Sequence, residues 1–457
     1  MDETKGLPTE NKMGTMPIGR LIITMSLPMI ISMLVQALYN VVDSVFIARY
    51  SQDALTAVSS YSFPAQNLMI GFATGTGVGV NALLSKSLGE KNFKKANKTA
   101  GNGLLLAGFA YIIFLIFGLF FSETFIAFQT DTPAVIEAGR QYLTICCVCS
   151  FGIFGEIMFE RLMQSTGKTL LTMFTQGFGA IVNIILDPIF IFALDLGAAG
   201  AAIATVIGQI AAFILAIILH HKYNTEVRIS REDFKPNLRI IGTIYAVAIP
   251  SIIMVGIGSV MTTSLNKILG GISAELKDIP ATVFGVYFKL QSFIFMPIFG
   301  LNNGVIPVIA YNYGARKRKR MLDALKVAAL IAVSVMIVGL LLMQVFPEQA
   351  LKLFDAKDDM MAIGIPALRT ISLSFVFAGV CIVLGSSFQA LGKGIYSMIV
   401  SFARQIVVLL PAAYLFSLTG NVNLVWWAFP IAEIMSLTAS VGLFIYLYKT
   451  VISKIEK

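Results

Sequence analysis

The chain has 457 residues, of which 57% are hydrophobic and only 13% charged, and its 34 Lys and Arg against 25 Asp and Glu give a net charge of +9. Soluble domains carry about 25% charged residues, and so few charges cannot cover a chain of this length in water. A soluble protein is therefore excluded, and lipid is the main solvent. The four cysteines and two histidines show no spacing typical of a disulfide framework or a zinc site.

Long apolar runs follow one another along the whole chain. Each is about as long as a helix that crosses ~30 Å of hydrocarbon, whereas a transmembrane barrel would show shorter alternating segments. We therefore predict an all-α integral membrane protein with twelve spans at 21–48, 57–87, 99–121, 134–166, 170–193, 197–219, 240–268, 281–313, 323–345, 361–389, 395–417 and 424–447.

The basic residues are unevenly divided between the loops on the two sides of these spans. One side collects most of the 34 Lys and Arg, including the run 316–320, and the other has only Arg49, Lys277, Lys352 and Lys357. Lys and Arg concentrate on the cytoplasmic side of membrane proteins. We therefore predict that both termini are cytoplasmic, and that the positive net charge reflects topology and not nucleic-acid binding.

The two halves of the sequence repeat each other with a shift of 225 residues. Under this shift Gln66 falls on Gln291 and Gly89 on Gly314. Because each half holds an even number of spans, the repeat is parallel, and substrate is expected between the two halves near the midplane. The predicted organisation is an N-terminal tail at 1–20, an N-lobe at 21–219, a linker at 220–239, a C-lobe at 240–447 and a C-terminal tail at 448–457.

Ionisable groups at membrane depth are costly and are functional candidates by default. The N-lobe is the more acidic of the two, and oxygen ligands of this kind suit a proton or Na⁺. The N-lobe candidates are Asp43, Glu156, Glu160, Arg161 and Asp187, and the C-lobe candidates are Lys267, Lys289, Arg369, Arg404 and Glu433.

The most specific local string is the one that joins Asn183, Asp187 and Pro188. Asn183 and Asp187 are four residues apart and so share one helical face. Pro188 has no backbone N–H, which frees a carbonyl one turn earlier. A cation site is the functional interpretation, and a buried Asp at a kink is the structural alternative. For Asp43 the alternative is an interfacial pair with Arg49.

Other polar residues at depth have structural and functional interpretations of their own. Glu160 and Arg161 are expected to form an internal salt bridge or to snorkel. Lys289, Arg369 and Arg404 have a structural interpretation as partners of backbone carbonyls, and Glu433 is interpreted either as a counterion or as a group that attracts a cation. We predict that the substrate cavity is lined by Tyr39, Asn40, Gln66, Glu156, Tyr287 and Gln291.

The motifs of the chain resemble those of a known family of transporters. They are Leu27-Pro28, Tyr39-Asn40 with Asp43, the glycines of 75–79, the string 183–192 and the segment 307–314. Together, and over essentially the whole chain, they are similar to the multidrug and toxic compound extrusion (MATE) family in its bacterial DinF-like branch. The resemblance implies a monomer with two six-helix lobes around a V-shaped cavity in the bacterial plasma membrane.

The resemblance also implies an activity and a site. The activity is export of amphipathic or cationic compounds in exchange for H⁺ or Na⁺, without another cofactor. Motif positions imply an N-lobe cation site, possible for Na⁺, and a bend of the first helix at Pro28. The implied cation-site residues are Asp43, Asn183, Asp187 and Thr205. A C-lobe cation site of another branch is expected to be absent.

Three other functions remain to be compared with transport of this kind. A flippase for lipids or lipid-linked oligosaccharides would gather Lys267, Lys289, Arg369 and Arg404 on one surface. An intramembrane enzyme would need a nucleophile and base or a metal motif, and the sequence shows neither, nor a phosphate-binding loop for ATP. A duplicated design with acids at the midplane suits alternating access better than it suits a channel.

Overall fold

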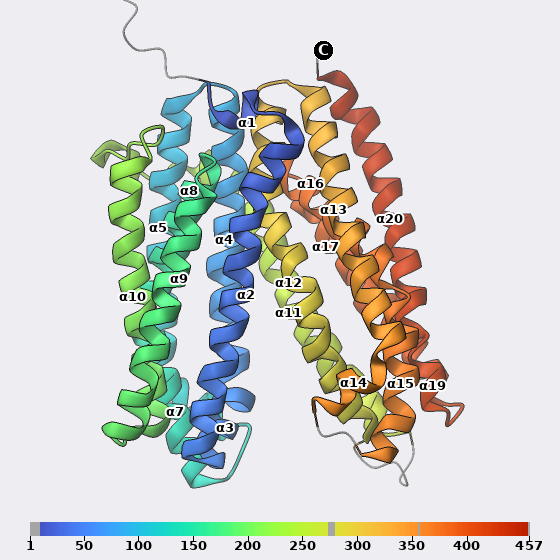
Figure 1. The fold of residues 1–457 in the computed structure, drawn as a ribbon. Coiled ribbons are helices and arrows are strands. Elements are labelled where there is room, and N and C mark those ends of the chain that lie inside the picture. The colour runs from blue at the N-terminus through green and yellow to red at the C-terminus, as the bar shows by residue number, and fades with distance from the viewer. Residues whose placement is uncertain (1–9, 273–278, 355–356, 456–457) are drawn as a thin grey trace, which may run out of the picture.

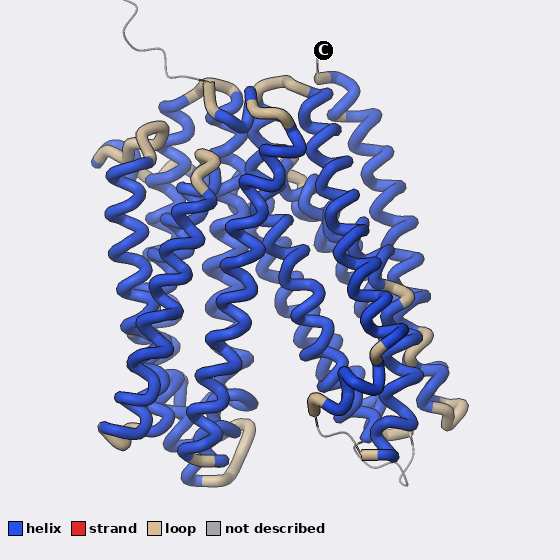
Figure 2. Tube along the Cα trace, in the orientation of Figure 1, coloured by secondary structure: helices blue, strands red, loops and turns tan. Residues whose placement is uncertain are grey.

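The computed structural model describes residues 10–272, 279–354 and 357–455. These residues form helices and connecting loops, with no strand among them. Figures 1 and 2 show two groups of helices that meet at the end where α1 and the C-terminus lie and diverge toward the other end. Of the predicted tails and loops, residues 1–9, Lys277 and residues 456–457 lie outside the described residues.

The first half of the chain forms one of the two groups. Its elements are α1 (Lys12–Thr15), α2 (Ile18–Tyr50), α3 (Gln52–Thr56), the π-helix η1 (Ala57–Ser62), α4 (Phe63–Gly89), α5 (Phe93–Phe120), α6 (Ser122–Ala127), α7 (Pro133–Val148), α8 (Phe151–Ser165), α9 (Thr169–Pro188), the π-helix η2 (Ile189–Ala193), α10 (Gly197–Tyr223) and the short η3 (Arg231–Phe234).

The second half repeats this order. Its elements are α11 (Leu238–Gly270), α12 (Ile279–Gly314), α13 (Arg318–Val345), α14 (Pro347–Lys352), α15 (Asp358–Ser372), α16 (Phe375–Ala390), α17 (Gly394–Phe402), the π-helix η4 (Ala403–Leu409), α18 (Leu410–Ser417), α19 (Val422–Val425), α20 (Ala428–Thr450) and η5 (Ile452–Lys454).

The number of spans agrees with the sequence. Ten helical stretches of the described residues are long and apolar enough to cross a membrane, and two bent pairs bring the number to twelve. The pairs are α7 with α8, bent by 46°, and α15 with α16, bent by 47°. Both breaks lie at matching places of the two halves, since residue 149 shifted by 225 is residue 374. The all-α, twelve-span prediction is confirmed.

The first span continues as one helix through its proline. α2 is a single helix of 33 residues with the buried Pro28 inside it. Pro28 has no N–H to donate to the carbonyl one turn earlier, and the hydroxyl of Thr169 donates to that carbonyl, on Thr24, at 3.3 Å. A side chain of α9 therefore satisfies the group that the proline leaves free, as membrane helices require.

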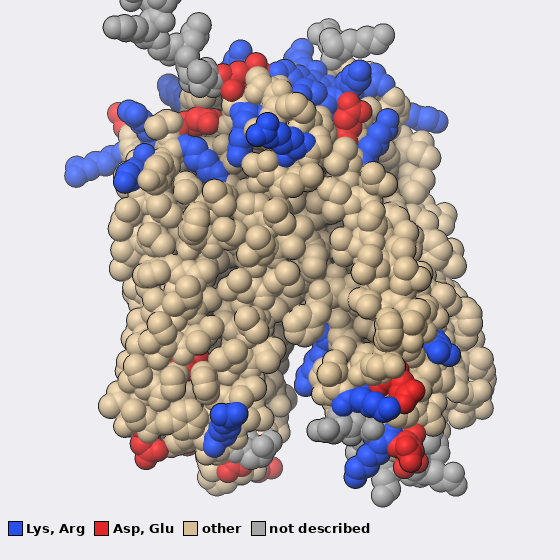
Figure 3. All heavy atoms as spheres, viewed as in Figure 1, with Lys and Arg blue, Asp and Glu red and all other residues tan. Residues whose placement is uncertain are grey.

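Charge separates the two ends of the molecule. Lys and Arg gather at the end where α1 and the C-terminus lie, which we call the basic end, while the middle of the molecule carries few charges (Figure 3). The same view shows a cleft between the two halves at the opposite end, which we call the open end. The fold thus holds two lobes together at one end and leaves space between them at the other.

Candidate functional site

A group of polar side chains lies between α9 and α10 in the first lobe. The amide nitrogen of Asn183 donates to Oδ1 of Asp187 at 3.1 Å and to the hydroxyl of Thr205 at 3.4 Å. Asp187 is fully buried, and Asn183 and Thr205 are nearly so. The i, i+4 spacing therefore places both side chains on one face, as predicted, and α10 supplies the third.

Three acceptor oxygens in this region have no hydrogen-bond donor. They are Oδ1 of Asp43, Oδ2 of Asp187 and Oδ1 of Asn183. Asp43 comes from α2, which packs against α9, and its charge acts on Asp187. Within the described part of the chain Asp43 forms no ion pair with Arg49, so the interfacial alternative is wrong. We call Asp43, Asn183, Asp187 and Thr205 the N-lobe cluster.

Two glycines explain why α9 and α10 approach closely enough to build the N-lobe cluster. A Cβ on Gly208 would lie 2.7 Å from the carbonyl oxygen of Gly179 and 3.2 Å from Cβ of Asn183. A Cβ on Gly179 would lie 3.0 Å from the carbonyl oxygen of Gly208. The backbones therefore touch one turn from Asn183, and any larger residue would separate the two helices that carry the cluster.

The cavity residues predicted in the first lobe differ in their neighbours and in their exposure. The Tyr39 side chain on α2 lies within electrostatic reach of Glu156, Asp43 and Asp187. Gln66 on α4 accepts a hydrogen bond from the Tyr142 hydroxyl at 3.4 Å, and the exposed Asn40 stands beside Tyr39. Tyr39 therefore experiences the charges of both the N-lobe cluster and Glu156.

Glu160 and Arg161 do not form the expected salt bridge. Glu160 accepts hydrogen bonds from Thr175 at 2.9 Å and Gln176 at 2.8 Å. Arg161 donates to Gln164 and to Asn303, both at 2.9 Å. Consecutive residues of a helix point about 100° apart, so the two side chains find partners on different helices. Arg161 in fact joins the first lobe to α12 of the second.

The second lobe contains a partly buried ion pair that the sequence did not predict. Nη1 of Arg404, in η4, lies 2.5 Å from Oε1 of Glu433 in α20. Tyr287 is buried among the rings of Phe284 and Phe429 and feels the charges of the same pair. Tyr287 therefore lies in the packed interior of the lobe, while Gln291 one turn later is half-buried.

The other cations of the second lobe have separate surroundings. Lys289 lies over the ring of Phe354 at 6.0 Å, and Lys267 lines a shallow pocket beside Asn266. Arg369 is exposed, and its carbonyl accepts a hydrogen bond from Gln344. With Arg404 paired to Glu433, each of these four cations has different neighbours among the described residues.

The N-terminal segment closes the basic end. Met13 of α1 is fully buried, and its carbonyl accepts hydrogen bonds from Asn312 at 3.0 Å and Arg320 at 3.2 Å in the second lobe. On the other side, the amide of Asn11 donates to the carbonyl of Thr166 in the first lobe at 3.0 Å. Residues 11–16 therefore bridge the two lobes, a role that the sequence analysis missed because the segment is short and polar.

The backbones of α4 and α12 also touch at this end. A Cβ on Gly89 would lie 2.0 Å from the carbonyl oxygen of Tyr311, and one on Gly314 would lie 2.1 Å from that of Lys86. These two glycines are partners in the 225-residue repeat. The repeat thus brings two equivalent helix ends into direct contact, which leaves no passage between the lobes at this crossing.

A duplicated helical bundle, closed at one end and open at the other, is a fold of membrane transporters. The family model of MatE matches residues 28–189 and 250–415, one stretch in each half. The chain belongs to the MatE family, and it is therefore a multi-pass membrane transporter and not an enzyme.

Known proteins agree with this assignment over nearly their full length. The chain is 26% identical to the multidrug export protein MepA of Staphylococcus aureus (strain MSSA476) over 438 residues, which are 95% of this chain and 94% of that protein. It is 26% identical to MepA of Staphylococcus haemolyticus (strain JCSC1435), with 88% of each chain covered. Among solved structures, a MATE in complex with MaL6 superposes with a TM-score of 0.89 at 25% identity, covering 98% of this chain and 99% of that one.

Proposed function

We propose that this protein exports amphipathic or cationic compounds in exchange for H⁺ or Na⁺, by alternating access. Its similarity to multidrug export proteins over nearly the whole chain supports the class of substrate. The N-lobe cluster supports the coupling. We further propose that the protein works as a monomer surrounded by lipid.

The observation that carries the proposal is the set of unpartnered oxygens in the N-lobe cluster. Asp43, Asp187 and Asn183 each keep an acceptor oxygen without a donor. A carboxylate or amide oxygen only accepts, and burying it unpartnered costs free energy. A proton or a hard cation would supply the missing positive charge, because both bind to oxygen.

Both coupling ions fit this set of groups. For Na⁺, Asp43, Asn183, Asp187 and Thr205 would supply the oxygen ligands, with no His or Cys needed. Among the described residues no three His, Cys, Asp or Glu side chains gather at one point, so a site for a metal that requires such a group has no support. For H⁺, one carboxyl group would take up the proton and donate it to the oxygen of a neighbour.

The two ends of the molecule support a working cycle. The open end gives access to the space between the lobes, while the α4–α12 crossing and residues 11–16 close the basic end. We propose that the basic end faces the cytoplasm, with both termini there, and that the lobes at 21–219 and 240–447 rock about the linker at 220–239. Pro28 would act as a hinge of α2. Coupling then requires only that ion and drug differ in affinity between the two states.

The drug would bind between the lobes, with Glu156, Tyr39, Asn40 and Gln66 on one wall and Gln291 on the other. Glu156 has no hydrogen-bond partner among the described residues, and its charge can attract a cationic compound. The charges of Glu156 and of the N-lobe cluster both act on Tyr39, so a cation bound at either position would change the electrostatic field that this side chain experiences. Tyr287 is buried, so it would pack behind the residues that contact the drug and would not contact the drug itself.

The test is efflux of a cationic dye from proteoliposomes with a pH gradient or a Na⁺ gradient imposed separately. One gradient should accelerate efflux by the wild-type protein, and D43N and D187N should each abolish that acceleration while the protein elutes as a folded species. Undiminished acceleration in both variants would overturn the cation site. Efflux of a lipid-linked oligosaccharide in place of the dye would favour a flippase instead.

A further inference from the structure

The short helix α1 offers free backbone carbonyls to the second lobe. A helical carbonyl normally accepts from the N–H four residues later, and for Met13 that residue is Pro17, which has no N–H. The carbonyl of Met13 therefore needs another donor, because Met13 is fully buried. Two side chains of the second lobe supply it, the amide of Asn312 at 3.0 Å and the guanidinium of Arg320 at 3.2 Å.

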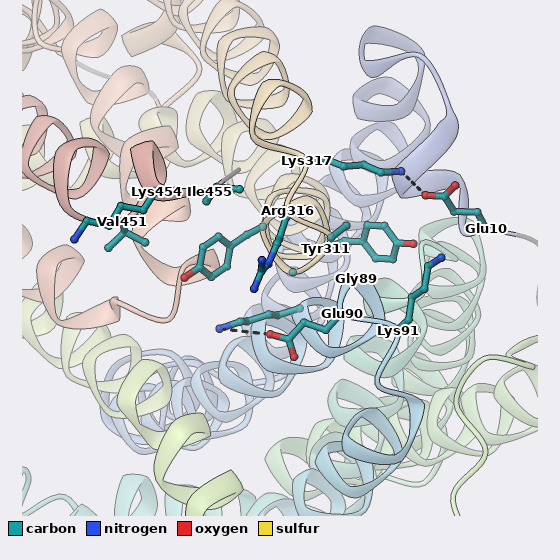
Figure 4. A pocket seen from close by; sticks show the side chains of 14 residues that line it. Glu10, Gly89, Glu90, Lys91, Tyr311, Arg316, Lys317, Val451, Lys454 and Ile455 are labelled. Atoms are coloured by element: carbon teal, nitrogen blue, oxygen red, sulfur yellow. Dashed lines mark hydrogen bonds and ion pairs between the residues drawn. The ribbon is translucent and has the colours of Figure 1, made fainter. Parts of the chain in front are cut away.

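The second lobe also holds the carbonyls on either side of Thr15. Arg320 donates to the carbonyl of Met16 at 2.7 Å, and Lys317 donates to that of Gly14 at 3.0 Å. Lys317 also pairs with Glu10, and Figure 4 shows these two side chains pointing toward each other beside the pocket at the α4–α12 crossing. Charged donors make stronger hydrogen bonds than neutral ones, so this docking contributes to the closed basic end.

The first lobe holds the same segment at both of its ends. The amide of Asn11 donates to the carbonyl of Thr166 at 3.0 Å and to both carboxylate oxygens of Glu226 at 2.8 Å. At its other end the segment continues directly into α2, and the hydroxyl of Thr169 in α9 donates to the carbonyl of Thr24 in α2. The bonds to the second lobe therefore lie between two attachments to the first.

The segment is too short to follow both lobes when they separate at this end. Asn11 and Met13 are two residues apart, and a fully extended chain spans at most ~3.6 Å per residue. Even if α1 unfolds, these two positions can lie no more than about 7 Å apart. A wider opening must break the bonds to one lobe. Because the first lobe holds the segment at both ends, the bonds to the second lobe are the ones that break.

We propose that residues 13–16 form a latch on the second lobe, which undocks when the basic end opens and sets the share of molecules closed at that end. The latch rests on the alternating access of the proposed function and adds the element that must be released. In the closed state Asn312, Lys317 and Arg320 satisfy the carbonyls of the latch, and in the open state water takes their place. Weaker docking therefore shifts the population toward the open basic end.

Gly14 allows the latch to be undocked without a change in the second lobe. A Cβ on Gly14 would lie 3.0 Å from the ring of Tyr311 and 2.8 Å from the carboxylate of Glu10, so the side chain of G14L has no room in the docked state. The matched control is G19L in the first turn of α2, where the position is exposed and an added Cβ meets nothing within 4 Å. R320M removes the guanidinium donor without adding bulk, and it decides alone if G14L does not fold.

Spin labels at K94C and K319C report the width of the basic end. Lys94 and Lys319 are exposed, lie in the first turns of α5 and α13, and are partners in the repeat. The background is a full chain in which the four native cysteines are replaced and dye efflux is retained. Double electron–electron resonance in lipid nanodiscs measures the distance between the labels. The positive control is G89A, whose Cβ would lie 2.0 Å from the carbonyl oxygen of Tyr311 and so forces α4 and α12 apart.

We expect one main distance in the wild type and in G19L, with a minor population at longer distance. G14L and R320M should each raise that minor population about threefold or more. A rise in G89A without one in G14L and R320M would overturn the latch and leave alternating access intact. No longer distance in any variant, G89A included, would overturn the rocking of the lobes and the latch with it. An equal rise in G19L and G14L would also overturn the latch.

Discussion

At one pair of equivalent positions, the two lobes differ in how two neighbouring spans contact each other. In the first lobe Gly179 and Gly208 bring α9 and α10 into backbone contact. Shifted by 225 residues, these positions are Arg404 and Glu433, whose side chains meet at 2.5 Å. In one lobe the absence of side chains lets the two spans touch, and in the other lobe a partly buried ion pair joins them.

This difference decides which lobe has acids available to an external cation. The positions equivalent to Asn183, Asp187 and Thr205 are Val408, Ala412 and Pro430, so the second lobe has no counterpart of the N-lobe cluster. The one buried acid among the described residues of this lobe, Glu433, already has Arg404 as counterion. In the first lobe Asp43 and Asp187 lie near each other without a cationic side chain in hydrogen-bond contact. A duplicated scaffold can thus leave acids without a cationic partner in one half and pair the acid of the other half.

The largest expected effect separates the two lobes by function. D187N should abolish the acceleration of dye efflux by an ion gradient. R404M/E433L, which removes the C-lobe ion pair, should keep this acceleration. Coupling free energies of ~1–3 kcal/mol correspond to a change of about 5–150-fold in the affinity for the second ligand. The measurement is the ratio of efflux with and without the gradient. A C-lobe variant that loses the gradient response would contradict the comparison.

Breaking the ion pair from one side tests the C-lobe directly. R404M leaves the carboxylate of Glu433 buried without its partner, and we expect the free energy of unfolding to fall by about 3–5 kcal/mol. R404M/E433L should recover most of this loss, because no charge then remains buried. Denaturant unfolding in detergent checks both values. Equal stability of R404M and wild type would mean that the pair is screened by water.

The glycine contact of the N-lobe is tested by adding one methyl group. G208A places a Cβ 2.7 Å from a backbone oxygen of Gly179, which cannot rotate away, and overpacking of this kind costs about 1–3 kcal/mol. The matched control is G242A, in α11, where an added Cβ meets nothing within 4 Å and removal of a helix glycine stabilises by about 0.5–1 kcal/mol. Thermal unfolding distinguishes the opposite signs.

The smallest expected effect concerns the basic end, where both lobes meet. The hydrogen bond from Lys317 lowers the pKa of Glu10 below its ordinary value of 4.5. The folded state therefore gains stability from this pair above pH 4.5 and loses it as the pH falls through the lowered pKa. For a partly exposed pair the gain is about 0.2–1 kcal/mol. The difference in thermal stability between wild type and E10Q should be present at pH 7 and shrink toward pH 3.

Sequence patterns predicted the positions of side chains on a helix better than they predicted their partners. Asn183 and Asp187 were placed on one face because helix periodicity is local and depends only on spacing. Glu160 and Arg161 were wrongly joined, since neighbours in sequence point in different directions on a helix and each found a partner on another span. Arg404 and Glu433 were both noted, but a separation of 29 residues carries no local signal. Aligning them with Gly179 and Gly208 through the repeat would have suggested that they meet.

The sequence by itself determined the solvent, the twelve spans and the acidic character of the first lobe. Those features depend on composition, on the length of apolar runs and on local periodicity, which need no knowledge of how helices pack. Only the tertiary structure decided that Asp43 lies near Asp187, that Arg161 reaches Asn303, and that residues 11–16 bridge the lobes. These contacts join segments far apart in the chain, and they form because glycines and buried polar groups fix which helix faces meet.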